Sequence, residues 1–238
     1  MATSGSTDFS VTRDDIISRA LRLIGAIAQG ESPTTEQLNE AAIALNGLVK
    51  AWQADGMPLW ALKTYSIALT SGTSSYRIGV GEFINTPKPL RVTQAYNHDT
   101  VSNVDIPMRI ITKQEYNILG NKTSSGNPIQ VYYDPQNTYG DLYVFPVPTT
   151  VEATNNVINI IYQRPFEDFD SATDTPDFPS EWYDAVVFGL AVRLAPEYGL
   201  PVDQRQALRA EAKEIKDAAL GMGTEEGSLY FGVERRAW

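Results

Sequence analysis

The chain has 238 residues, of which 42% are hydrophobic and 20% charged, so it is long enough to bury a core and global disorder is excluded. It has no cysteine and one histidine, His98, which excludes disulfides, thiolate metal sites, cysteine nucleophiles and a multi-histidine metal site within one chain. Its 19 basic and 29 acidic residues give a net charge of −10, which disfavours binding to a phosphate backbone or to an anionic membrane.

Two helices are predicted at the start of the chain. Residues 12–15, Thr-Arg-Asp-Asp, resemble a helix cap, and apolar residues at helical spacing over 16–27 predict a helix of about four turns that ends near Gly30. Ser32 followed by proline is typical of a second helix start, and that helix should stop at Asp55-Gly56. We expect the two helices to form an antiparallel hairpin.

The periodicity changes from Trp60 onward. Six segments are short, β-branched or aromatic, and bounded by Gly, Pro, Asn and Ser, as strands are: residues 64–70, 75–80, 90–96, 129–134, 142–147 and 157–163. They predict an antiparallel sandwich or barrel-like module. One short helical patch, residues 112–119, interrupts them.

The last third returns to helices. Residues 165–184 carry seven acidic and no basic side chains, and we interpret 165–179 as an extended acidic linker. A helix from Ser180 is apolar on nearly all sides, so we expect it to be buried on several sides, by the hairpin and, where one hairpin cannot cover every face, by another subunit. A final helix, about 202–220, has a narrow apolar stripe and a charged outer face.

The predicted fold is therefore of the α+β class. A helical bundle domain from residues 1–59 and 180–220 carries an inserted antiparallel β domain, residues 60–164, and an extended C-terminal tail, residues 221–238. Burying the large apolar side chains of this tail would contribute roughly 6–12 kcal/mol, whereas ordering its 18 residues costs near 27 kcal/mol. An ordered tail therefore needs backbone pairing or a partner groove, and the alternative is a frayed terminus.

No residue set points to one chemistry. His98 lies in a polar turn, and Glu82, Glu115 and the acids of 165–184 have no apolar setting that would raise one carboxyl pKa for glycosidase chemistry. Asp168, Asp170 and Asp174 resemble a calcium loop only loosely, because its glycine and terminal glutamate are missing.

Two further features have structural interpretations. Gly79-Val80-Gly81 has no phosphate-loop ending and predicts a hairpin corner. Trp52 and Trp60 frame the junction between the second helix and the first strand, where packing is the preferred interpretation.

The sequence shows no pattern of a secretory signal and none of a transmembrane segment. Residues 1–10 have neither the basic start nor the apolar run of a secretory signal, and the apolar run 185–192 is far short of the roughly 20 residues that span a bilayer. We therefore expect no transmembrane segment and a product that stays in the cytoplasm where it is made.

Two stretches carry a resemblance to a known family. Residues 45–60 read LNGLVKAWQADGMPLW, with Gly72 and Tyr76 downstream, and residues 178–183 read FPSEWY and run on to LAPEYG at 194–199. In this order they resemble the head-to-tail adaptor proteins of tailed bacteriophages, the tail-tubular and packaged-DNA-stabilising adaptor group of short-tailed phages. The resemblance covers nearly the whole chain.

The resemblance implies a structural protein and no enzyme, cofactor or metal. Twelve copies would form a ring beneath the portal, extend the DNA channel and present a platform for the next tail or nozzle protein, in the neck of a virion assembled in the host cytoplasm. In this family the C-terminal segment commonly reaches the portal, which here maps onto Leu229, Tyr230, Phe231, Arg235, Arg236 and Trp238.

The charge agrees independently with this function, because a channel through which DNA slides should not hold phosphates. The candidate channel-lining residues are Asp168, Asp170, Asp174 and Asp177, with an outward-facing linker as the alternative. A peptidoglycan-cleaving virion enzyme and a carbohydrate-binding β module are the competing hypotheses.

Overall fold

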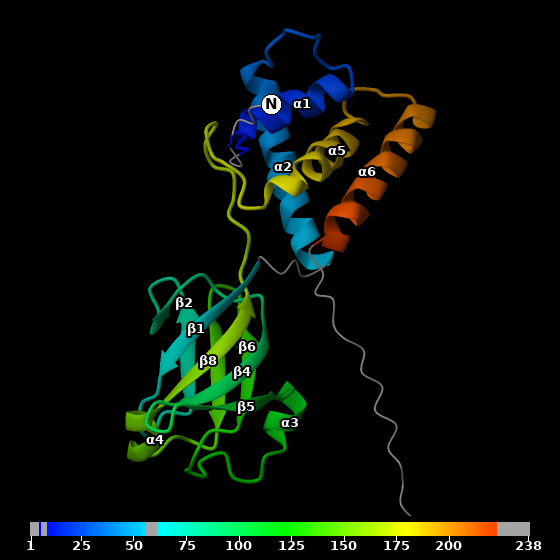
Figure 1. Ribbon diagram of the computed structural model, residues 1–238. Helices are drawn as coiled ribbons and strands as arrows, with labels where there is room; N and C mark the ends of the chain where they lie inside the picture. Colours follow the sequence, from blue (N-terminus) through cyan, green and yellow to red (C-terminus); the bar gives the residue numbers. More distant parts are fainter. Residues whose placement is uncertain (1–4, 6–8, 56–60, 223–238) are drawn as a thin grey trace, which may run out of the picture. The chain divides into compact units, whose positions relative to one another are not determined.

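The computed structural model describes residues 5, 9–55 and 61–222, and the chain divides into two compact units. The first, here the helical unit, is formed by residues 1–48 and 169–238; the second, the β unit, is formed by 49–168. The protein is thus a mixed structure of helices and strands, as expected (Figure 1). In the described residues no helix combines the length and the apolarity that a membrane span requires.

Helices from both ends of the sequence make up the helical unit. They are α1 (Arg13–Leu23), α2 (Thr35–Asp55, which continues into the β unit's range), the short 3₁₀ turn η2 (Ser180–Trp182), α5 (Tyr183–Leu194) and α6 (Val202–Met222). The α5 helix makes backbone contacts with both α1 and α6. The antiparallel hairpin of the first two helices stays a prediction.

The capping signals decide where the first two helices begin and end. The predicted cap of α1 is confirmed, because the Thr12 hydroxyl accepts from the Asp15 N–H and the Asp15 carboxylate accepts from the Thr12 N–H at 3.0 Å. The helix ends at Leu23, earlier than predicted, and Gly25 follows with a left-handed φ of +70°. The second helix begins after Thr34, not Ser32, because Thr34 and Gln37 form the reciprocal box.

The interior of the helical unit is built around α5. Seven of its twelve residues are buried, and they pack with the buried face of α1, which includes Ile16 and Leu21. The chain itself therefore covers most of the all-round apolar pattern of α5, whereas Phe188 and Val192 are half-buried. The apolar stripe predicted on α6 faces the interior at its two alanines, because Ala212 and Ala219 are buried.

The β unit is one eight-stranded sheet in the order β1-β8-β4-β5-β6-β7-β2-β3, and Figure 1 shows it curling into a barrel-like form. Its strands are β1 (Leu62–Ala68), β2 (Ser75–Gly79), β3 (Ile84–Asn85), β4 (Arg91–Asp99), β5 (Val104–Ile110), β6 (Gln130–Pro135), β7 (Gly140–Phe145) and β8 (Asn156–Gln163). Two pairings, β2 with β3 and β5 with β6, are parallel, and the others are antiparallel. The sheet is therefore mixed, not purely antiparallel as predicted. Short helices α3 (Lys113–Asn117) and α4 (Thr150–Asn155) interrupt the strands.

All six predicted strand segments are strands, whereas β3 and β5 were missed. Apolar residues alternate along β5 (VDIPMRI), but only Met108 is buried, and Pro107 lies opposite Tyr96 of β4. Proline lacks an N–H and is confined to strand edges or to positions outside the ladder hydrogen bonds. Beyond Met108 the strand leaves β4 and pairs with β6 through Arg109 and Ile110.

Candidate interaction surfaces

The acidic segment is held to α2 by two buried phenylalanines. In the β unit, the Phe166 N–H donates to Gln53 Oε1 at 2.9 Å and the Phe166 carbonyl accepts from Lys50 Nζ at 2.7 Å. In the helical unit, the Phe169 N–H donates to Asn46 Oδ1 at 2.9 Å. The segment is thus anchored at its start and is not an unattached linker.

The four candidate channel-lining acids have different surroundings. Asp168 is exposed and forms an ion pair with Lys50 at 2.8 Å, and Asp170 is exposed. Asp174 is half-buried, and its Oδ2 accepts the backbone N–H groups of Asp170 at 2.8 Å and of Ser171 at 2.6 Å. Asp177 is half-buried. The Asp174 carboxylate therefore shapes a turn, and in the described residues no three acidic or histidine side chains are grouped as a metal site requires.

The other candidate carboxylates serve the backbone or a neighbouring cation. Glu115 completes the capping box of α3 with Thr112 and pairs with Arg109, which lowers the pKa of Glu115. Glu82 lies 4.0 Å from Arg77. Cap hydrogen bonds also lower the pKa of Asp15 and Glu152. These shifts are opposite to the raised pKa that a general acid needs at neutral pH.

His98 is a strand residue and not a turn residue as predicted. It lies in β4 directly opposite Asp105 of β5, and its Nδ1 is 2.7 Å from Asp105 Oδ1. A turn lies at Gly79–Gly81, where Gly81 adopts a φ of +80° and its N–H donates to Asn85 Oδ1 at 2.9 Å, but the predicted hairpin is wrong because the flanking strands β2 and β3 are parallel.

Several sequence-based predictions lie outside the described residues. They are the tail residues Leu229, Tyr230, Phe231, Arg235, Arg236 and Trp238, and Trp60 at the helix–strand junction. Trp52, the other tryptophan of that junction, is half-buried on α2.

A tyrosine cluster on the β unit was not predicted. Tyr132 of β6 and Tyr143 of β7 are cross-strand partners with ring centroids 5.7 Å apart, and Tyr116 of α3 stacks on Tyr132 at 5.4 Å. Burial, with Asp134 nearby, raises the pKa of Tyr132 to about 12. The three rings pack against one another, so the cluster fixes α3 to the sheet. It was not predicted because these residues meet only through the register of the strands.

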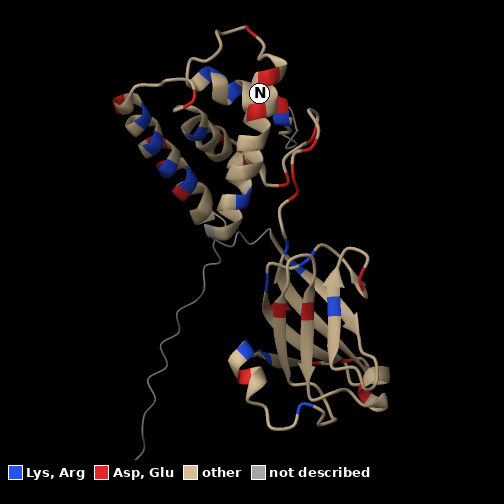
Figure 2. Cartoon of the chain, turned by 180° about the vertical axis from the view of Figure 1, so that it is seen from behind, with Lys and Arg blue, Asp and Glu red and all other residues tan. Residues whose placement is uncertain are grey.

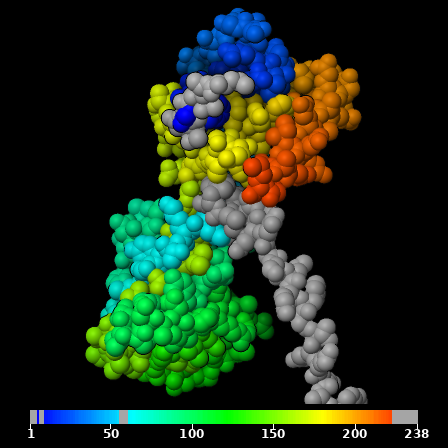
Figure 3. Space-filling model, viewed as in Figure 1, coloured from blue at the N-terminus to red at the C-terminus, as the bar shows by residue number. Residues whose placement is uncertain are grey.

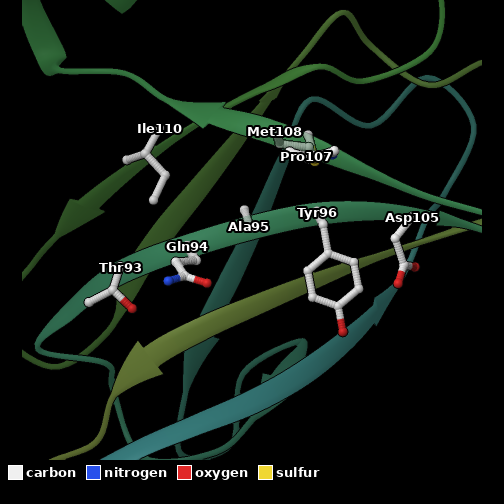
Figure 4. A pocket seen from close by; sticks show the side chains of 8 residues that line it. All are labelled: Thr93, Gln94, Ala95, Tyr96, Asp105, Pro107, Met108 and Ile110. Atoms are coloured by element: carbon white, nitrogen blue, oxygen red, sulfur yellow. The ribbon is translucent and has the colours of Figure 1, made fainter. Parts of the chain in front are cut away.

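A shallow depression of about 510 Å³ lies where β5 leaves β4 (Figure 4). The register of β4 against β8 shifts between Val92 and Gln94, and the pocket wall includes Gln94, Tyr96 and Asp105 beside apolar Met108. Its single carboxylate, Asp105, is already paired with His98. The arrangement offers polar contacts and an apolar floor but no nucleophile–base pair.

A second open groove, of about 870 Å³, lies in the helical unit between α2 and α5. Ile43 in its floor is 75% exposed, and the charged side chains of Glu40, Arg193 and Glu197 surround it. Surfaces of this kind, apolar with a charged rim, are features of interaction sites between proteins.

No curated protein matches the chain. The family model described as SU10 adaptor protein matches residues 11–232, a range that includes both units and both stretches on which the resemblance was based. The chain therefore belongs to the SU10 adaptor protein family, a family of phage head–tail adaptors.

Proposed function

We propose that the protein is a head-to-tail connector that forms a ring, of twelve copies by the family resemblance, beneath the portal of a phage virion. The observation that carries this proposal is the match to the adaptor family over residues 11–232. The ring would extend the DNA channel and present a platform to the downstream tail or nozzle protein. Its place is the neck of the virion, and it has no catalytic role.

The charge of the chain supports passage of DNA without binding. Each copy carries −10, so a ring would repel phosphates instead of holding them. Asp168 and Asp170, which are exposed, and Asp174 and Asp177, which are half-buried, are the proposed channel-lining acids. Replacing all four by lysine should make DNA stick and slow its exit; unchanged ejection would place this segment on the outer surface.

The C-terminal segment is the proposed portal-docking element. Residues 223–238 follow α6 and contain Leu229, Tyr230, Phe231, Arg235, Arg236 and Trp238, whose burial requires a partner groove by the free-energy comparison above. Large aromatic side chains and arginine are the residues that most often dominate binding energy at protein interfaces.

Truncation tests this element. A chain ending at Met222 should keep a cooperative fold but lose attachment to portal oligomers in sedimentation or negative-stain images. As a matched control, the chain with Glu225 and Glu226 replaced by glutamine keeps the tail's apolar residues and should attach normally. Attachment of the truncated chain with wild-type affinity would refute the docking proposal.

A further inference from the structure

The helical unit carries two chemically opposite sides. One lies at the starts of α1 and α5, and the other lies along α6, which contacts both α5 and η2. Figures 1 and 2 show these helices in opposite views, and Figure 3 shows the surface of α6 open to solvent.

The first side is an exposed aromatic ring, with the carboxylates of Asp15 and Asp184 and the guanidinium of Arg19 near its partner Tyr183. Phe9 is 61% exposed and packs edge-on against Tyr183, with ring centroids 5.4 Å apart. Burial raises the pKa of Tyr183; Arg19 partly opposes the shift, and Asp184 and Asp15 add to it, so these charges lie close to the ring. Glu181, one turn before Asp184, is exposed. We call Phe9, Asp15, Glu181 and Asp184 the acidic patch.

The second side is one flank of α6. Val202, Arg205, Arg209, Lys213 and Lys216 follow one another at spacings of three or four residues, which places them on one face of the helix. Arg209 and Lys213 are exposed, and Val202 is 60% exposed. We call these five residues the basic flank; Figure 2 marks both basic and acidic positions along α6.

Most acidic residues of α6 lie away from the basic flank. Glu211 and Glu214 are exposed on other faces of the helix, whereas Asp217, also exposed, follows Lys213 by four residues and borders the flank. The flank is therefore locally basic although the whole chain carries −10.

We propose that the basic flank of one copy docks on the acidic patch of the next copy, as the side-by-side contact within the ring. Phe9 and Val202 would supply the apolar centre, and the carboxylates would face Arg209 and Lys213. The inference rests on the proposed ring and names the surfaces that build it.

Charge complementarity selects the partner surface, because a contact between two basic flanks or between two acidic patches would bring like charges together. A two-fold contact could also pair each flank with the other copy's patch, so the head-to-tail arrangement follows from the proposed ring. A head-to-tail contact pairs opposite charges at every step and closes into a ring when the rotation allows.

Charge reversal tests the contact with the full chain assembled on its portal. The variant R209E/K213E and the variant E181K/D184K should each weaken ring assembly at least tenfold, measured by mass photometry and electron micrographs. Circular dichroism checks that both remain folded. As controls of equal charge change, K63E/K122E in the β unit and E211K/E214K on other faces of α6 should assemble as the wild type does.

Mixing the two interface variants is the decisive experiment. Each then offers a reversed surface that complements the other's, and an equimolar mixture should recover rings. Rings that form normally from either variant alone, or a mixture that stays unassembled, would overturn this contact while leaving the adaptor function intact. Absence of any wild-type ring on the portal would instead overturn the proposed function.

Discussion

Replacing Leu190 by alanine should strongly destabilise the helical unit of an isolated copy. Leu190 lies on α5 and is fully buried within its own chain. The substitution removes about three carbon groups at about 0.8 kcal/mol each, and the cavity left behind brings the loss to about 2–5 kcal/mol. Because the surrounding atoms belong to one chain, the loss should appear in the monomer and not only in the ring.

Urea unfolding followed by circular dichroism at the helix band measures this loss. Ile43→Ala is the matched control, because Ile43 is 75% exposed on α2 and its truncation should cost below about 0.5 kcal/mol. If Leu190→Ala destabilises the monomer no more than Ile43→Ala, the interior of the helical unit is not built as described, and α5 would need another subunit to cover it.

Three further predictions concern local packing, pH and charge. Gly140→Ala should destabilise the β unit by about 1–3 kcal/mol in a thermal melt, because the new Cβ would overlap the Tyr133 ring, and less in a Tyr133→Ala background. The hydrogen bonds to Thr12 lower the pKa of Asp15 in the folded chain. The stability that this cap contributes is therefore complete above the unfolded pKa of about 3.9 and is lost as the pH falls below that value. Asp15→Asn should remove this pH dependence when helicity is followed by circular dichroism during an acid titration. The wild-type protein should not shift duplex DNA at about 10 μM protein and physiological salt, whereas tight, weakly salt-dependent binding would contradict the sliding channel.

Local signals in the sequence predicted part of the fold well. The cap at Thr12 was found because its residues are adjacent in sequence and satisfy each other. The start of α2 was missed because Ser32-Pro33 offers an equally good pattern two residues earlier, and the sequence alone does not reveal which box closes. Apolar residues alternate along β5, but the run contains Pro107, and a proline within a run counts against a strand.

Long-range features were less accessible from the sequence. The tyrosine cluster depends on the register of β6 against β7, and the acidic patch joins Phe9 and Asp15 to residues near position 183. The basic flank is different, because its spacing lies within one helix and could have been read directly. The acidic character of 165–184 was read correctly as composition, but the anchoring of Phe169 by Asn46 needed the structure.

The central claim is that this adaptor-family chain forms a closed ring on the portal. Electron microscopy of the full chain mixed with its portal oligomer tests it most directly. The account predicts a closed ring of copies seated beneath the portal and continuing its channel. Micrographs and native mass measurements that show only unassembled monomers beside intact portals would contradict it.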